Sequence, residues 1–170
     1  MFHSKIAVDN TRFIFATNFA GNPKMDRYGD TRPKANVIIP SAEQAKDLIK
    51  MGVNVRQTRP RQEDDPDTFQ PEYYVTALLI YRDRNGEAVK YPPRVYLVSG
   101  DAAPVLLDED SVKKIDQMRI CNVNVILNPY EYEPGKNSLY VRVMYVEQDL
   151  DDDPYAHLYR NRNQGEGLPF

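Results

Sequence analysis

Apolar and polar residues alternate along most of the chain, and this pattern predicts a mainly β protein. In residues 138–147, Leu139, Val141 and Val143 share one face, while Tyr140 and Arg142 share the other. A period of two is typical of a strand with one buried face. The same pattern predicts further strands at 11–18, 35–39, 54–58, 73–82, 94–98 and 120–132.

Turn sequences separate some of these predicted strands. Asn85-Gly86 stands between the strands at 73–82 and 94–98, and Pro134-Gly135 follows the strand at 120–132. Such sequences are typical of tight hairpin turns. We therefore expect antiparallel pairing.

Helix signals interrupt the strands twice. Ser41 can cap a helix, Gln44 stands at the capping-box position, and Gly52 can end the helix. A second short helix is expected at about residues 111–118, where the preceding acids Asp108–Asp110 suit the positive end of a helix dipole. Five or more strands with one or two short helices fit an antiparallel β-barrel of the oligonucleotide/oligosaccharide-binding (OB) type, or alternatively a β-sandwich.

Composition and charge divide the chain into a domain and a tail. The 170 residues, of which 41% are apolar, suffice for one domain with a core. The net charge is −3, yet residues 12–61 carry ten bases against four acids, whereas residues 147–170 carry six acids against two bases. We expect residues 1–148 to form the domain and residues 149–170 to form a disordered acidic tail.

The cysteine content and the hydropathy pattern favour a cytoplasmic protein. Cys121 is the single cysteine, so no disulfide framework is expected. No stretch reaches the roughly 20 apolar residues of a membrane span, and the amino terminus lacks the pattern of a secretory signal. We expect the protein to act in the cytoplasm, away from membranes.

Groups suited to catalysis are scarce. His3 and His157 lie near opposite ends, Cys121 falls within a predicted strand, and the glycines match no phosphate-binding loop. The run Asp151–Asp153 fits a solvated tail better than a magnesium site. The sequence therefore predicts a protein that is not an enzyme and that uses no cofactor or metal.

Aromatic rings interleaved with arginines and lysines are abundant instead. Proteins hold an unpaired nucleic-acid strand by stacking its bases on aromatic side chains within a basic groove. The sequence therefore predicts a nucleic-acid-binding surface formed by Arg12, Phe19, Lys24, Arg27, Tyr28, Arg32, Lys34, Arg56, Arg59, Arg61, Tyr81, Arg82, Tyr91, Arg94, Tyr96, Tyr140 and Arg142.

Several short motifs follow one another in residues 11–147. They are Phe19-Ala20-Gly21-Asn22-Pro23, Ile38-Ile39-Pro40, Gly52-Val53-Asn54-Val55-Arg56, Pro92-Pro93-Arg94-Val95, Leu107-Asp108-Glu109-Asp110 and Asn128-Pro129-Tyr130. In this order they resemble phage-encoded single-stranded DNA-binding proteins. The resemblance implies an OB-type barrel and a function in phage DNA replication or recombination, often beside a phage annealing protein.

The last residues carry a second resemblance. An acidic run at 149–153 precedes Leu168, Pro169 and Phe170. This arrangement is similar to the acidic tail and apolar tip of bacterial single-strand binding proteins. The resemblance implies recruitment of replication or recombination proteins through the tip, since a terminal ring can enter an apolar pocket while its carboxylate meets a cation.

Two other functions are compatible with these residues. Tyr and Arg are also enriched in protein interfaces, so the chain could be a phage protein-interaction module, such as an inhibitor of a host nuclease or an assembly component. A metal-dependent nuclease is a weaker alternative. The pattern leaves open the preference for DNA over RNA and the formation of a homo-oligomer.

Titration with a poly-dT oligomer and with a duplex of the same length separates the first two functions. We expect strong preference for the single strand, with an affinity that falls with salt at a log–log slope of roughly −0.7 per neutralised phosphate. Equal affinity for both ligands, or a flat response to salt, would contradict the DNA-binding hypothesis.

Overall fold

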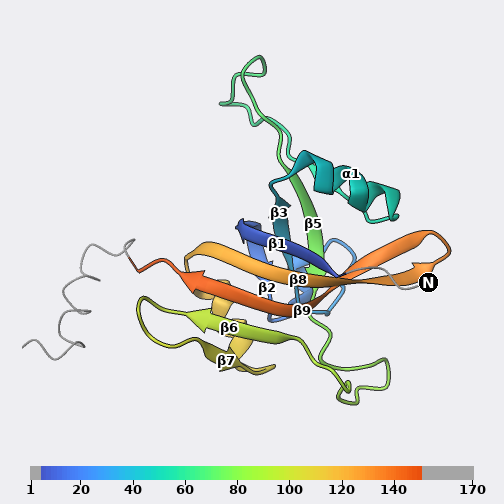
Figure 1. Ribbon diagram of the computed structural model, residues 1–170, viewed down its shortest axis with the longest axis vertical. Helices are drawn as coiled ribbons and strands as arrows, with labels where there is room; N and C mark the ends of the chain where they lie inside the picture. Colours follow the sequence, from blue (N-terminus) through green and yellow to red (C-terminus); the bar gives the residue numbers. More distant parts are fainter. Residues whose placement is uncertain (1–4, 151–170) are drawn as a thin grey trace, which may run out of the picture.

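The computed structural model describes residues 5–150 as a curved sheet with short helices packed beside it (Figure 1). The strands are β1 (Ile6–Thr11), β2 (Phe13–Asn18), β3 (Lys34–Ile39), β4 (Arg56–Gln57), β5 (Tyr73–Leu78), β6 (Arg94–Val98), β7 (Val105–Leu107), β8 (Ile120–Glu133) and β9 (Lys136–Gln148). The helices are the α-helix α1 (Ala42–Lys50) and the 3-10 helices η1 (Pro23–Met25) and η2 (Ser111–Gln117). The expectation of a mainly β fold with short helices is confirmed.

The sheet is mixed, whereas the sequence led us to expect antiparallel pairing throughout. The main path runs β1-β8-β9-β5-β3-β2, and β6 joins it by pairing with β9. Strand β9 pairs antiparallel with β8 along most of its length. Its other edge pairs in parallel with β5 through Ala77 and Leu139, and then in parallel with β6 through Arg94 and Val143.

The predicted hairpin at Asn85-Gly86 is wrong for this reason. Strands β5 and β6 pair in parallel with successive stretches of the same edge of β9, so β6 continues in the direction of β5 instead of folding back on it. The Asn85-Gly86 turn closes a small local loop, in which Arg82 and Ala88 form an isolated bridge. The second predicted hairpin is confirmed, because Glu133 pairs with Lys136 across the Pro134-Gly135 turn.

Strands β1 and β2 form the two ends of the sheet path, although Arg12 alone separates them in the chain. Thr11 Oγ1 donates to Ile38 O at 2.6 Å, and Ile38 N donates to Arg12 O at 3.1 Å. These bonds hold the bend between β1 and β2 against β3. The sheet is strongly curved but not closed, which corrects the expectation of a barrel.

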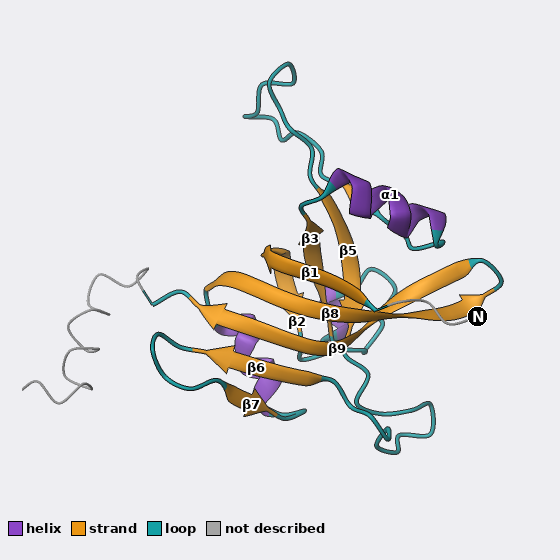
Figure 2. Cartoon of the chain, in the orientation of Figure 1, coloured by secondary structure: helices purple, strands orange, loops and turns teal. Residues whose placement is uncertain are grey.

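Buried side chains from the strands form one hydrophobic core, and Figure 2 shows the short helices beside the strands. Val37, Val75, Leu127 and Met144 come from four different strands and are almost fully buried. Helix η2 adds the buried Val112 and Ile115. None of the helices in residues 5–150 is long and apolar enough to cross a membrane.

Helix α1 begins where the capping pattern predicted. The Ser41 hydroxyl accepts from the Gln44 backbone N–H at 3.2 Å, and Ala45 and Leu48 are buried. The Gln44 side chain donates to Ala7 O at 2.9 Å, so it ties the helix to β1. This contact replaces the reciprocal bond of a full capping box.

The carboxylate of Asp116 anchors the end of β2. It accepts from Thr17 Oγ1 at 2.7 Å, from Phe19 N at 2.8 Å and from Ala20 N at 2.9 Å. Hydrogen bonds to a charged acceptor are stronger than neutral ones. Helix η2 therefore holds the point at which the chain leaves β2 and enters the loop of residues 19–33.

Gly52 brings the end of α1 against the β8–β9 hairpin. Its φ is +79°, and an added Cβ would lie 1.8 Å from Gly135 O. Its carbonyl accepts from Asn137 N at 3.0 Å, and Asn137 Nδ2 donates to Met51 O at 2.6 Å. Only glycine permits both this backbone conformation and this approach.

We predict that Gly52→Ala destabilises the protein by about 3 kcal/mol or more, because it adds a backbone clash to an unfavourable φ. Gly86→Ala is the matched control: its φ is also +79°, but no atom lies within 4 Å of the added Cβ. The control should lose only about 1–2 kcal/mol. Urea unfolding measures the free energy of unfolding of both variants. If both lose the same amount, the close approach of Gly52 to Gly135 does not contribute to stability.

Candidate functional site

A groove of about 650 Å³ runs over the outer surface of β3 and β5. The β8–β9 hairpin and the loop of residues 25–32 form its sides, and Asn36, Thr76 and Ser138 lie among its lining residues. Asn36 and Thr76 face each other across β3 and β5, and Thr76 Oγ1 donates to Asn36 Oδ1 at 2.7 Å. Five residues of the predicted surface line this groove: Arg27, Tyr28, Arg32, Lys34 and Arg56.

Two of these cations are engaged in folding the loop beside the groove. The Lys34 ammonium lies 2.9 Å from Asp30 and 3.4 Å from Asp26, and Arg32 lies 2.9 Å from Asp30. Burial acts to raise the pKa of Asp30, but hydrogen bonds from Arg32 and Lys34 outweigh it and hold this pKa well below its usual range. Asp30 therefore stays ionised and neutralises much of the charge of its two partners.

Two other arginines of the groove have no carboxylate partner among residues 5–150. The Arg56 guanidinium lies 5.7 Å from the Tyr74 ring centre, and its Nη2 donates to Thr76 Oγ1 at 3.3 Å. The Arg27 guanidinium lies 5.7 Å from the ring centre of Tyr28. Contacts with rings and hydroxyls leave the positive charge available to an incoming anion.

Exposed rings stand beside these free cations. The Tyr28 side chain is 85% exposed, and Phe15 is 56% exposed. Phe15 meets Tyr74 edge to face, with ring centres 5.4 Å apart. Tyr132 lines the groove on the hairpin side, and Tyr140 is stacked on Tyr130 with ring centres 4.9 Å apart. Of these rings, Tyr28 and Tyr132 line the groove, and Phe15 lines a separate hollow.

The prediction from sequence missed Phe15, Tyr74, Tyr130 and Tyr132. Regular alternation would place Phe15 on the same face as Phe13, whose ring packs on the buried Phe19 at 5.7 Å. The β2–β3 register shifts between Ile14 and Asn18, and Phe15 has a φ of +62°. This bulge turns the ring outward, and no sequence signal reveals it.

The hairpin tyrosines also depend on a register shift. Glu133 pairs with Lys136 at the turn, so regular counting from the turn would pair Tyr130 with Leu139 and place Tyr130 and Tyr140 on opposite faces. The register shifts between Glu131 and Glu133, so that Tyr130 pairs with Ser138 and Asn128 with Tyr140, which puts both rings on one face. The period of two alone does not show that this face borders a groove.

Two further hollows hold other members of the predicted surface. The first, about 410 Å³, includes Arg12, Arg59 and Arg61; the second, about 500 Å³, includes Tyr81, Tyr91, Arg94 and Arg142. Arg12 is paired with Glu72. Arg82, beside the second hollow, lies 3.0 Å from Glu109.

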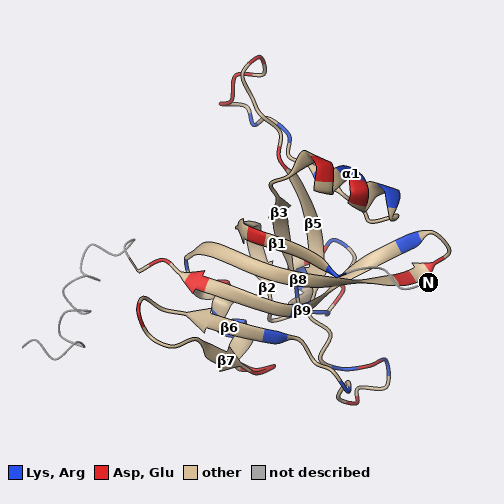
Figure 3. Cartoon of the chain, viewed as in Figure 1, with Lys and Arg blue, Asp and Glu red and all other residues tan. Residues whose placement is uncertain are grey.

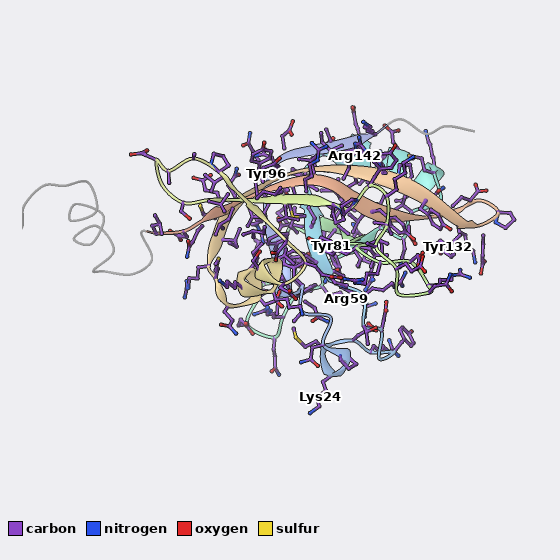
Figure 4. All side chains as sticks on the ribbon, turned by 90° about the horizontal axis from the view of Figure 1, so that it is seen from below. Lys24, Arg59, Tyr81, Tyr96, Tyr132 and Arg142 are labelled. Atoms are coloured by element: carbon purple, nitrogen blue, oxygen red, sulfur yellow. The ribbon has the colours of Figure 1, made fainter. Side chains whose placement is uncertain are left out.

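The remaining predicted residues do not join the groove. Phe19 is fully buried in the core, which makes its prediction as a DNA contact wrong. Tyr96 stacks on Tyr145, with ring centres 4.7 Å apart, on the outer face of β6 and β9. Figure 4 shows Lys24 far from Tyr96 and Arg142, and Figure 3 shows that basic positions are spread over the molecule. The predicted residues therefore form several separate clusters.

The predicted partner-binding residues Leu168, Pro169 and Phe170 lie outside the described residues. Within residues 5–150, no three His, Cys, Asp or Glu side chains lie close enough together to hold a metal ion.

A groove with exposed rings and free guanidinium groups has the chemistry of a surface for single-stranded nucleic acid. The model of a family described as "Putative phage ssDNA-binding domain" matches residues 2–164. The chain belongs to this family. The matched range includes all of residues 5–150, so the groove and both further hollows lie within the phage ssDNA-binding domain.

A solved structure is also similar to this family member. It is the crystal structure of gp2.5, a single-stranded DNA-binding protein encoded by bacteriophage T7. The identity is 11% and the TM-score is 0.42, over 89% of this chain and 97% of the other. Similarity at this level establishes neither a shared fold nor a shared site. No curated protein matches the sequence.

We predict that Asp30 stabilises the domain in a pH-dependent way. Its pKa is depressed in the folded state, so its contribution is present above about pH 4 and is lost as the pH falls below the usual value of 3.8. Asp30→Asn should therefore unfold at lower urea than the wild type at pH 7, and the gap should narrow at pH 3. If the urea midpoints of the two proteins differ by the same amount at pH 7 and at pH 3, Arg32 and Lys34 do not stabilise the ionised carboxylate of Asp30.

Proposed function

We propose that the groove binds single-stranded DNA and that the chain coats such strands during phage DNA replication or recombination. Membership of the phage ssDNA-binding family supports this ligand. Replication and recombination are proposed as the setting because both processes expose unpaired strands.

The observation that carries the choice of surface is one exposed ring beside two unpaired guanidinium groups. Tyr28 presents a ring to solvent, and Arg27 and Arg56 line the same groove without a carboxylate partner in residues 5–150. Base stacking on such a ring contributes about 1–3 kcal/mol per base. Each free cation that meets a phosphate adds the entropy of a released counterion.

The paired cations have a different role. Lys34 and Arg32 already neutralise Asp30 and Asp26, so a phosphate would have to compete with those carboxylates. We infer that these two residues shape the loop and that Arg27 and Arg56 make the phosphate contacts. The groove would then depend on few cations, and the salt dependence of binding would be moderate.

Neutral polar side chains at the base of the groove favour binding without a strict sequence requirement. Asn36 and Thr76 are bonded to each other, and Ser138 lies on the adjoining part of β9. Stacking tolerates any base because every base has an aromatic face. We therefore infer that the protein binds strands of differing sequence, as coating requires.

Partner recruitment is proposed from the sequence alone. Residues 149–170 would act as an acidic tail on the domain of residues 1–148, with Leu168, Pro169 and Phe170 as the tip that meets replication or recombination proteins. A terminal ring and its carboxylate together suit an apolar pocket with a basic rim.

We predict that Arg56→Ala weakens binding to a labelled oligo-dT about tenfold, equivalent to about 1.4 kcal/mol, and lowers the salt slope by about 0.7. Lys113→Ala is the matched control, because it removes the same charge from helix η2, where Lys113 is exposed and lies 3.7 Å from Asp110. Fluorescence anisotropy at several salt concentrations measures both.

Tyr28 supplies the second half of this test. Tyr28→Ala should lose about 1–3 kcal/mol of binding free energy, whereas Tyr28→Phe should stay close to the wild type because it keeps the ring. Arg56→Ala and Tyr28→Ala variants that both bind like Lys113→Ala would refute the groove as the binding surface.

A further inference from the structure

The hollow of about 500 Å³ at the start of β6, here called the β6 hollow, is separate from the groove. Its apolar part includes Pro92, Pro93, Leu106 and Val143. Its polar part includes Tyr81, Arg94 and Arg142 and the exposed pair Lys90 and Tyr91. Apolar walls with a few polar groups are typical of a binding site for a small or terminal group.

One polar atom of a residue that lines the β6 hollow lacks a partner. The Tyr81 hydroxyl oxygen is buried and makes no hydrogen bond with any of residues 5–150. Burial, followed by the nearby charges of Glu109 and Asp108, raises the pKa of Tyr81 to about 12, so the hydroxyl keeps its proton. A buried donor without a partner is unfavourable, and a ligand with an acceptor oxygen or nitrogen would remove that cost.

The charges of the β6 hollow favour an anionic ligand. Lys90, Arg94 and Arg142 have no carboxylate within ion-pair distance in residues 5–150, and the Lys90 ammonium lies 5.5 Å from the Tyr91 ring centre. The two acids of the lining are already engaged. Glu109 pairs with Arg82 at 3.0 Å, and Asp108 Oδ1 accepts from the N–H groups of Ser111 and Asp110 at 2.7 and 2.9 Å.

Strand β9 connects the β6 hollow to the groove. Ser138 and Leu139 line the groove, Arg142 and Val143 line the β6 hollow, and Tyr140 stands between them. The β8–β9 register pairs Val141 with Leu127 and Val143 with Ile126, so Arg142 is the extra residue of a bulge and is exposed. Leu139 and Arg142 are three residues apart, a distance of only about 10 Å along a strand.

Tyr140 lies near a cation of the groove and a cation of the loop between β5 and β6. Its burial raises its pKa, and the charges of Arg32 and Arg84 act on it in the opposite direction. Arg32 lines the groove, and Arg84 lies in the loop between β5 and β6. One cation of the groove and one cation of this loop therefore both act on Tyr140.

We propose that the β6 hollow is a second nucleotide-binding subsite, which takes a base and phosphate of the same single strand after it leaves the groove along β9. The base would lie against Tyr91 and the proline segment, the Tyr81 hydroxyl would donate to an acceptor of the nucleotide, and Arg94 and Arg142 would meet phosphates. The inference rests on the proposed function of the groove.

The absence of tryptophan from the chain allows a direct test. Tyr28→Trp reports on the groove and Tyr91→Trp on the β6 hollow, because both side chains are exposed, at 85% and 75%. Each variant is titrated with oligo-dT of roughly 6 and roughly 20 nucleotides. The first length is near the lower end of the site sizes of one OB fold, roughly 4 to 16 nucleotides, and the second exceeds them. The short oligomer should quench only Trp at 28, and the long one should quench both.

Substitutions in the β6 hollow provide the second measurement. The double variant Arg94→Ala/Arg142→Ala should bind the long oligomer about tenfold more weakly and the short one within about twofold of the wild type. Tyr81→Phe keeps the packing and removes the unpartnered hydroxyl. It should therefore fold as stably as the wild type, bind the long oligomer more weakly and leave the affinity for the short oligomer unchanged.

The outcomes distinguish this inference from the proposed function. If the long oligomer quenches Trp at 28 and leaves Trp at 91 unchanged, the β6 hollow is not a subsite and the groove stands. If the short oligomer quenches Trp at 91 instead, the proposed path along β9 is wrong. If neither length changes the fluorescence of Trp at 28 and Arg56→Ala does not change the affinity for oligo-dT, the groove is not the binding surface.

Discussion

Strand β9 is the constraint on which the rest of this structure depends. One edge of β9 pairs with β8, and the other edge is divided between β5 and β6, both in parallel. Because β5 and β6 follow one another in the same direction along that edge, the chain between them leaves the sheet as a loop of residues 79–93. That loop carries Tyr81, Arg84 and Tyr91, and its position separates the groove beside β5 from the β6 hollow beside β6.

The charged residues of this domain divide into those that build it and those that remain available. Lys34 and Arg32 hold the loop beside the groove through Asp30, and Arg82 is held by Glu109. Arg27, Arg56, Arg94 and Arg142 have no such partner in the described residues, and all of them line a groove or hollow. A surplus of bases in a segment therefore overstates its capacity to bind phosphates, because nearby carboxylates neutralise part of it.

Local signals predicted local structure well. The Ser41 cap and the β8–β9 turn involve residues close in sequence, so their physics is contained in a short window. The alternation predicted for β9 holds only as far as Val141, because the bulge at Arg142 brings Met144 and Val146, instead of Val143, into the core. The same reasoning failed beyond the turn at Asn85-Gly86: the turn forms, but β5 and β6 pair with the distant β9 instead of with each other. It failed again at Phe15 and Phe19, where a bulge and the core reversed the expected exposure of two rings.

The sequence by itself determined the mainly β character, the two helices, the kinds of side chain available for stacking and phosphate contact, and the resemblance to phage single-stranded DNA-binding proteins, because these follow from residue type and short-range order. Only the tertiary structure decided which rings are exposed, which arginines are free of carboxylates and which of them share a groove. Those properties depend on contacts between residues far apart in the chain, such as Arg56 with Tyr74 on β5 and Asp116 with the end of β2. A hydrophobic pattern or motif within one segment does not determine which distant segment will pack against it.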